Sequence, residues 1–232
     1  MPGKVVQFEK IGGVTFFRNR RSKSVKISVK PDKSVLVSYP FYCSSREVAA
    51  FIDNNESWIL AQQKKMEQRR DKLSSDSKIE TKLHTVQFLQ GNNFDVSTKE
   101  NRINITVPDF ESEKSQKFIE EVLIQIYRVE AKKLLPPKLD KLSSEFGFRY
   151  NKVTIRNNKR NWGSCSNKNN ISLNLQMMKL PDELIDYILL HELVHTEIKN
   201  HGAGFWEKLN SITNNRAREL AKQVKQYSTY TL

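Results

Sequence analysis

The sequence predicts an α+β protein with a β-rich amino-terminal region over residues 1–108 and a region over residues 109–232 that carries the candidate catalytic side chains. Apolar and polar residues alternate at period two before residue 40, as in half-buried strands. After residue 112 the apolar residues recur at helical spacing. Three of the four histidines lie within eleven positions near the carboxy-terminal end. These observations predict strands in the amino-terminal part of the chain and a candidate site on a helix in the carboxy-terminal part.

The amino-terminal region begins with short strands. Residues 4–39 are expected to form a small antiparallel sheet with a turn at Gly12-Gly13. Within it, three apolar residues alternate with polar ones as on a strand with one solvated face; they are Val25, Ile27 and Val29. Ser44 and Glu47 then form a capping box, which predicts the start of a helix.

The middle of the chain returns to strands and then changes to helix. Strand character resumes over residues 82–107, and a long helix is expected from about Ser112. Pro136-Pro137 should interrupt this helix, because proline lacks the backbone donor that a helix interior needs. A second helix should then end at Gly147, a residue suited to a left-handed cap.

A polar loop over residues 156–166 separates strands expected at 153–155 and 171–175. Two interpretations stay open for this loop. It is a tight turn anchored by a buried Trp162, or it lines a functional site, because functional residues favour loops on rigid elements. The residues expected to line the site or contact substrate are Arg160, Asn161, Trp162, Ser164 and Asn174.

The strongest local signal is the motif His191-Glu192-Leu193-Val194-His195. Residues four apart share one face of a helix, so the two imidazoles can face one metal ion. His201, six residues later, is expected to supply a third ligand. Catalytic zinc takes three protein ligands and keeps a fourth position for water, which it acidifies. We therefore predict a Zn²⁺ site, with Glu192 as the general base.

A chance match on an ordinary amphipathic helix is the alternative. Against it, Pro181 and Asp182 mark a helix start, and a buried helix has no structural use for two histidines and a glutamate in one turn unless a cation satisfies them. Glu207 and Glu219 are weaker candidates for the third ligand. His84 has no second candidate ligand near it, so an ordinary strand residue is expected there.

The segment after the motif differs from that of metzincins, although its histidines have the same spacing. Ile198 stands where those enzymes have the glycine that turns the helix. The helix is therefore expected to continue to Lys199, with Asn200 in the left-handed conformation. Gly202 and Gly204 would free the loop that returns His201 to the metal.

Charge favours polyanionic partners. Lysine and arginine number 39 against 26 acidic residues, which gives a formal net charge of +13. The densest basic stretch runs from Arg18 to Lys33. Its charges are better explained by a solvated strand face than by a nucleic-acid surface, because the sequence shows no interleaved aromatic residues. Besides a peptide or protein substrate, nucleic acid or a protein bound to nucleic acid is therefore kept as a possible partner.

Composition also limits location. No apolar run approaches the length of a membrane span, and Met1-Pro2-Gly3-Lys4 lacks the apolar part of a signal peptide. Cys43 and Cys165 are far apart and suggest neither a disulfide framework nor a zinc knuckle. We therefore expect a cytoplasmic protein with no membrane association, and no feature indicates an oligomeric state.

Four short motifs follow one another along the chain. They are Asn161-Trp162-Gly163-Ser164-Cys165-Ser166, Ile171-x-Leu173-Asn174, His191-Glu192-Leu193-x-His195 and Asn200-His201-x-x-x-Phe205-Trp206. In order and spacing they resemble the YgjP-like metallopeptidase family, which is zincin-like and related to the SprT-like and WLM metallopeptidases. A looser similarity extends into the amino-terminal region.

This resemblance implies a zinc-dependent peptidase with a zincin-like catalytic region. Its zinc ligands would be His191, His195 and His201, and its catalytic base Glu192. One position departs from the family, which usually has arginine directly before the tryptophan. This chain has Asn161 there, with Arg160 one place earlier.

Two functions are therefore compared. The first is hydrolysis of peptide or protein substrates, with residues 170–175 as the edge strand that pairs with extended substrate. The second is a zinc-bearing interaction module that binds nucleic acid and hydrolyses nothing. Glu192 favours the first, because a purely structural zinc site needs no base and has four protein ligands instead of three.

Overall fold

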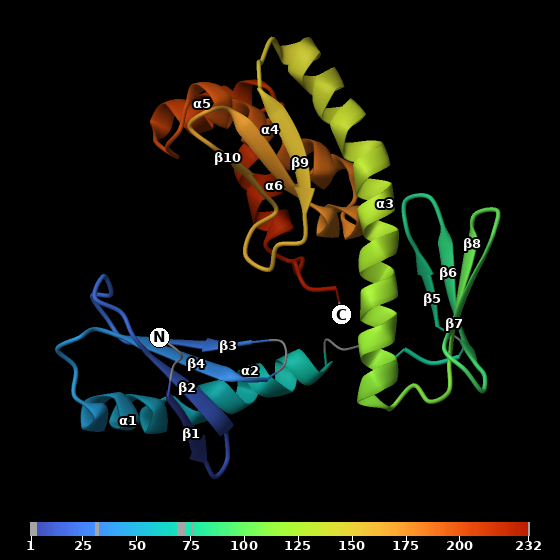
Figure 1. Cartoon of the computed structure of the whole chain (residues 1–232). Helices are drawn as coiled ribbons and strands as arrows, with labels where there is room; N and C mark the ends of the chain where they lie inside the picture. Colours follow the sequence, from blue (N-terminus) through green and yellow to red (C-terminus); the bar gives the residue numbers. More distant parts are fainter. Residues whose placement is uncertain (1–3, 31–32, 69–72, 76, 232) are drawn as a thin grey trace. The chain divides into compact units, whose positions relative to one another are not determined.

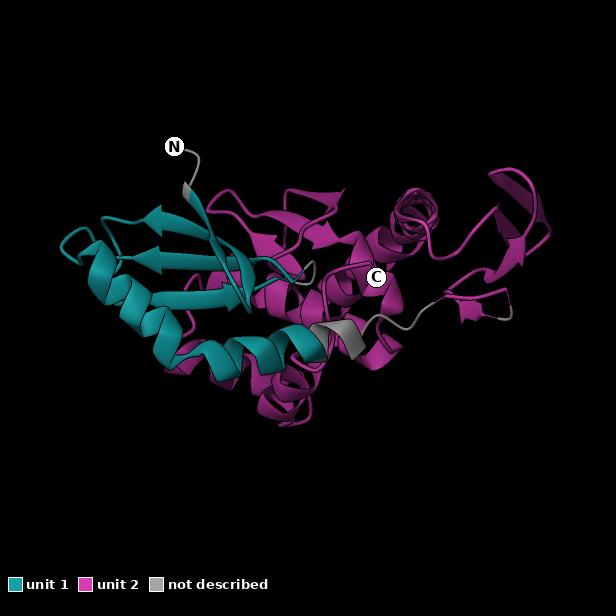
Figure 2. Ribbon diagram, turned by 90° about the horizontal axis from the view of Figure 1, so that it is seen from below, with its two compact units in different colours: residues 1–72 teal, residues 73–232 magenta. Residues whose placement is uncertain are grey.

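The computed structural model describes residues 4–30, 33–68, 73–75 and 77–231. The chain divides into two compact units, residues 1–72 and 73–232 (Figure 2). The sequence had placed the boundary at residue 108. The structure instead includes the strands between residues 78 and 107 in the second unit, because their apolar side chains join its core.

The first unit contains a four-stranded sheet. Its strands are β1 (Lys4–Phe8), β2 (Gly12–Arg18), β3 (Lys26–Val29) and β4 (Val35–Tyr39). Their order is β1-β2-β4-β3, and β2 and β4 are parallel. The expected purely antiparallel sheet is therefore wrong at its centre, because β4 enters between β2 and β3 instead of extending a meander. The predicted turn is present, with φ of +75° at Gly12.

Two helices lie along one face of this sheet (Figure 1). Helix α1 (Ser45–Asn54) begins with the predicted capping box, and α2 (Glu56–Gln68) follows after a break at Asn55. Their buried side chains pack with those of the sheet to form a small core. This core consists of Ile11, Val14, Val35, Val37, Val48, Ile52 and Ile59.

The second unit opens with a sheet of the same design. Its strands are β5 (Lys78–Glu80), β6 (Thr85–Gln90), β7 (Asp95–Lys99) and β8 (Arg102–Val107). The order is β5-β6-β8-β7, again with two antiparallel hairpins joined by a central parallel pair. The same arrangement of four strands thus occurs twice in the chain.

Helix α3 (Glu113–Phe146) is continuous through Pro136-Pro137, so the predicted interruption is wrong. Each proline removes the donor to a carbonyl four residues earlier. Those carbonyls belong to Lys132 and Lys133, two exposed residues, so the missing donors lie on the solvent side of the helix. The predicted cap is confirmed, since Gly147 ends the helix in the left-handed conformation.

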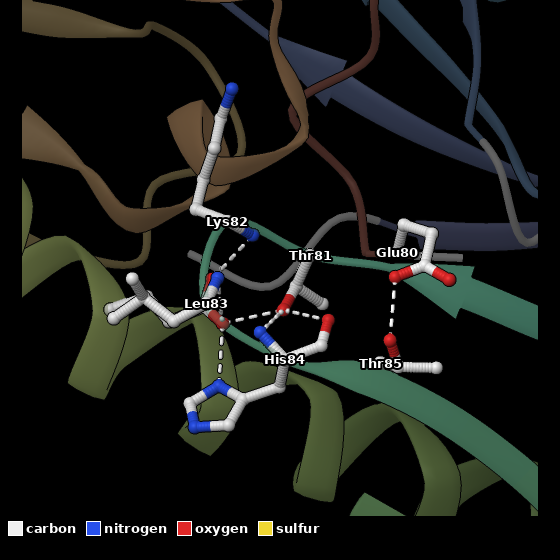
Figure 3. A network of polar contacts seen from close by, with 7 residues as sticks. Glu80, Thr81, Lys82, Leu83, His84 and Thr85 are labelled. Atoms are coloured by element: carbon white, nitrogen blue, oxygen red, sulfur yellow. Dashed lines mark hydrogen bonds and ion pairs between the residues drawn. The ribbon is translucent and has the colours of Figure 1, made fainter. Parts of the chain in front are cut away.

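A fully buried carboxylate on α3, that of Glu130, holds the turn between β5 and β6 against this helix. Figure 3 shows the turn residues Thr81, Lys82, Leu83 and His84. Glu130 accepts hydrogen bonds from the backbone N–H groups of Lys82 and Leu83, each at 3.1 Å, and from the Thr81 hydroxyl. His84 Nδ1 lies 2.7 Å from the same carboxylate. His84 is thus engaged just before β6, away from the other histidines.

We predict that Glu130→Ala lowers the free energy of unfolding by about 2–4 kcal/mol, because it leaves buried donors without an acceptor. Urea denaturation measures the change. The control is Glu145→Ala, at an exposed position of the same helix, which should change stability by less than about 0.5 kcal/mol. Equal effects of the two substitutions would contradict the role of the buried carboxylate.

The remaining elements surround the candidate site. A third sheet contains β9 (Lys152–Arg156), β10 (Gly163–Cys165) and β11 (Asn170–Asn174). Its order is β10-β11-β9, so β11 is central and the expected edge strand at 170–175 is wrong. A 3₁₀ turn, η1 (Leu175–Lys179), and the helices α4 (Asp182–Glu197), α5 (Ala203–Ser211) and α6 (Ala217–Val224) complete the unit.

The mixture of helices and sheets confirms the α+β prediction. The core of the second unit joins its first sheet to α3, the third sheet and α4 through α6. No helix in the described part of the chain combines the length and apolar content that crossing a bilayer requires.

Candidate metal centre

Helix α4 brings the histidine motif into the core. Two acidic residues in its first turn, Asp182 and Glu183, favour the helix electrostatically, and most of its later positions are buried. The helix ends at Glu197, and Ile198 is extended with φ of −122°. The expected continuation to Lys199 is wrong, and Asn200 has no positive φ. The chain reverses one turn after His195, which directs His201 back toward the helix.

The three predicted histidines converge. His201 Nε2 lies 3.1 Å from the Nε2 atoms of both His191 and His195. The nitrogen ligands of a tetrahedral zinc ion, at bond lengths of about 2.0–2.1 Å, lie about 3.3 Å apart, which is close to these two spacings. All three ligand nitrogens lie within 4.8 Å of one another. Among the described residues, these histidines form the one group of three or more such side chains close enough to hold a metal ion.

A backbone carbonyl orients one of these imidazoles. His195 Nδ1 lies 2.9 Å from the carbonyl oxygen of Ile198. A carbonyl can only accept a hydrogen bond, so Nδ1 carries the hydrogen and Nε2 keeps its lone pair toward the other histidines. Histidines that bind metal commonly donate their other ring N–H to a backbone carbonyl in this way, and here the contact depends on the early end of α4.

Phe205 of α5 packs against all three rings. Its ring centroid lies 4.9, 4.5 and 4.8 Å from those of His191, His195 and His201, respectively. Phe205 is fully buried, so it closes the inner side of the cluster and fixes the ring positions.

The surroundings favour neutral imidazoles. Burial, helped by the two neighbouring histidines, lowers the pKa of His191 to about 3. Burial also lowers the pKa of His195, although the hydrogen bond to Ile198 acts in the opposite direction. Neutral imidazoles are the form that binds metal, so these two side chains are ready to coordinate at neutral pH.

Glu192 packs against β10 of the third sheet, and one oxygen of its carboxylate has no hydrogen-bond partner among the described residues. Burial raises its pKa to about 8, and Oε2 has no hydrogen-bond partner among the described residues. A Cβ atom added at Gly163 would lie only 2.6 Å from Glu192 Oε1. Strand β10 can therefore approach this carboxylate so closely only because residue 163 is glycine.

These observations together fit a catalytic zinc ion. Three imidazole nitrogens lie within 4.8 Å of one another, imidazole is a ligand type that zinc prefers, and the next residue after His191 carries a carboxylate with an unpartnered oxygen. Three protein ligands are the number found in catalytic sites, where a position stays open for water.

The predicted lining residues differ in their placement. Asn174 is buried and acts as a clamp, because its side-chain amide donates to the carbonyls of Asn158 and Asn161. Trp162 packs against the core of the unit. Trp162 is only half-buried, so it anchors the loop in part, and the loop continues into β10.

Three of the predicted lining residues are exposed and do not join the histidine cluster; they are Arg160, Asn161 and Ser164. Asn161 Nδ2 donates to the carbonyl oxygen of Gly163 at 2.9 Å. The Arg160 and Ser164 side chains are exposed, and the Arg160 backbone N–H donates to the Asn158 side chain. Neither the sequence motif nor its spacing had pointed to Gly163, Ile198 or Phe205 as supports of the site.

Comparison with known proteins identifies the family. The model described as "YgjP-like, metallopeptidase domain" matches residues 23–227, most of the chain. The chain belongs to the YgjP-like metallopeptidase family. It is therefore a metal-dependent peptidase by family. No curated protein matches this chain.

Two solved structures are similar to part of this YgjP-like chain. One is the metallopeptidase zymogen abylysin of Pyrococcus abyssi, with 24% identity and a TM-score of 0.37 over 40% of this chain and 93% of that chain. The other is the metallopeptidase zymogen jannalysin of Methanocaldococcus jannaschii, with 26% identity and a TM-score of 0.36 over 40% and 94%.

For this YgjP-like protein, Gly163→Ala should reduce peptidase turnover about a hundredfold while leaving bound metal unchanged. The added methyl group displaces the Glu192 carboxylate, and misplacing a reacting group by about 1 Å has an effect of this order. Turnover of a peptide substrate at matched metal content measures it.

The control for that substitution is Gly204→Ala on α5. A Cβ atom at Gly204 meets nothing within 4 Å, so this variant should match the unsubstituted protein. If Gly163→Ala also retained full turnover, close packing of β10 on Glu192 would have no catalytic importance.

Proposed function

We propose that this protein hydrolyses peptide bonds with a zinc ion held by His191, His195 and His201, and with Glu192 as general base. The observation that carries the proposal is the convergence of three Nε2 atoms beside a buried carboxylate with a free oxygen. The alternative of a non-hydrolytic nucleic-acid module is not favoured, because the matching family is a metallopeptidase domain.

In this mechanism Glu192 moves the proton. When bound, zinc supplies a Lewis acid that lowers the pKa of a water molecule and polarises the scissile carbonyl. Burial alone favours the protonated form of Glu192, and the positive charge of a bound zinc ion would favour the ionised form instead. Oε2 has no competing hydrogen-bond partner among the described residues, so the ionised carboxylate would be free to accept the proton of that water and later return it to the leaving amine. Glu192 itself is buried, which reduces the screening of its electrostatic interactions by water.

We further propose that β10 pairs with extended substrate, in place of the strand expected from sequence. The Trp162 carbonyl accepts from the Asn174 N–H, and the Ser166 N–H donates to the Asn170 carbonyl. Hydrogen-bonded and non-bonded pairs alternate in an antiparallel ladder. The backbone groups of Gly163 and Cys165 therefore point away from β11, toward the free edge of the sheet.

The free edge of β10 is short, and one of its backbone groups already has a hydrogen-bond partner. The Asn161 side chain already covers the Gly163 carbonyl, which leaves the Gly163 N–H and both backbone groups of Cys165 to pair with a peptide. Main-chain pairing of this kind binds extended substrates with little dependence on their side chains. Asn161, at the position where the family usually has arginine, would then shape the edge strand.

The metal assignment predicts that His195→Ala abolishes stoichiometric zinc binding. Removing one of three ligands also removes the lone pair that Ile198 orients. Elemental analysis of the purified protein after dialysis measures the zinc content. The control is His84→Ala, which changes the one histidine outside the cluster and should retain the metal. Full zinc occupancy in His195→Ala would show that the ligand assignment is wrong.

The base assignment predicts that Glu192→Gln retains zinc and fold but lowers turnover about a hundred- to ten-thousandfold, the usual contribution of general acid–base catalysis. Glutamine keeps the size of the side chain and removes its basicity. Turnover of an unstructured protein or peptide library at matched zinc occupancy is the measurement.

A matched control lies on the same helix. Glu197→Gln removes an exposed carboxylate that pairs with Lys208 at 3.3 Å, and it should leave turnover unchanged. Equal rates for Glu192→Gln and the unsubstituted protein would exclude Glu192 as the base. Loss of zinc from Glu192→Gln would instead show that this carboxylate belongs to the ligand set.

A further inference from the structure

The first unit carries an excess of positive charge, and none of the residues assigned to the peptidase site belongs to this unit. Residues 1–72 contain 15 basic and 7 acidic residues. Residues 11–30 contain no acidic residue at all. Several basic side chains of this segment are exposed and form no ion pair within the described residues; they are Arg18, Arg20, Arg21, Lys23 and Lys26.

The fold places aromatic rings beside these charges. Strands β2 and β4 are parallel and in register, so Arg18 at the end of β2 lies opposite Tyr39 at the end of β4. The chain then continues through Phe41 and Tyr42. The arginines and the aromatic residues are about twenty positions apart in sequence, which is why the sequence showed no interleaving.

The contacts between them are specific. The Arg18 guanidinium lies 5.2 Å from the ring centroid of Phe41 and 5.7 Å from that of Tyr39. The Arg20 guanidinium lies 5.4 Å from the Phe41 ring. These distances are within the range of cation–π interactions, which hold the planar cations and the ring together.

Two of these rings face solvent. Phe41 is 56% exposed and Tyr42 is 77% exposed, although burial of such side chains would be favourable. The Tyr42 hydroxyl donates to the Lys23 carbonyl at 3.1 Å, so the ring is held in place while its faces stay open. We call the group Arg18, Arg20, Tyr39, Phe41 and Tyr42 the arginine–aromatic patch.

We propose that the arginine–aromatic patch binds single-stranded nucleic acid. Exposed aromatic rings offer surfaces on which unpaired bases stack, and the arginines offer both charge for phosphates and planes for stacking. An acidic peptide or an anionic membrane would use the charge but would gain no base stacking from Tyr42. The proposal concerns a second activity and does not depend on the peptidase site.

The test is binding of the full chain to a labelled oligothymidylate of about 15 nucleotides, measured by fluorescence anisotropy over a range of salt concentrations. Affinity should fall with salt, with a log–log slope of about −0.7 for each phosphate contacted. A duplex of the same length should bind more weakly, because its paired bases cannot stack on the rings.

Two substitutions separate charge from stacking. Arg20→Ala should weaken binding and reduce the magnitude of the salt slope by about 0.7, since one phosphate contact is lost. Tyr42→Ala should weaken binding about tenfold with little change in slope, whereas Tyr42→Phe keeps the ring and should bind nearly as well as the unsubstituted chain. These side chains are exposed, so circular dichroism should show an unchanged fold.

The control is Lys64→Ala, which removes one exposed positive charge from α2 in the same unit. Lys64 lies near Gly12, at the opposite end of β2 from Arg18, and should leave binding unchanged. Equal losses for Lys64→Ala and Arg20→Ala would overturn the proposal, because net charge alone would then explain binding. Equal affinity for polyglutamate or anionic vesicles, or binding that Tyr42→Ala does not weaken, would overturn it as well.

Discussion

Helix α4 has to end one turn after His195, and the rest of the site depends on this constraint. A helix that continued to Lys199 would carry His201 away from the face shared by the first two histidines. Because Ile198 is extended, its carbonyl turns back to His195 and the chain returns His201 to within 3.1 Å of both partners. One change of backbone direction thus places the third donor and orients the second.

Packing from two other elements holds this arrangement. Phe205 on α5 contacts all three imidazoles from the buried side. Strand β10 covers Glu192 from another side, where only a residue without a Cβ atom fits. Asn174 positions the loop before β10 through its hydrogen bonds to Asn158 and Asn161. The Glu192 carboxylate is buried, which accounts for its raised pKa.

The sequence predicted what depends on local pattern. Helical spacing and caps gave α4 and the end of α3 at Gly147, and the histidine spacing gave a cluster that the structure brings together. Strand order was not predictable, because pairing depends on contacts between distant segments. The central place of β11 followed only from the structure, as did the approach of Arg18 to Phe41. The tolerance of α3 for two prolines depends on solvent exposure, which local propensity does not report.

The three histidines lie within eleven positions, whereas Gly163 is nearly thirty residues from the carboxylate it touches. Closing a loop of about ten residues takes on the order of 10–100 ns and costs little chain entropy. The imidazole cluster can therefore assemble from one short segment as soon as α4 and its turn form. The covering of Glu192 requires the third sheet, so the metal ligands depend on local chain geometry whereas the burial of the base depends on packing between distant segments.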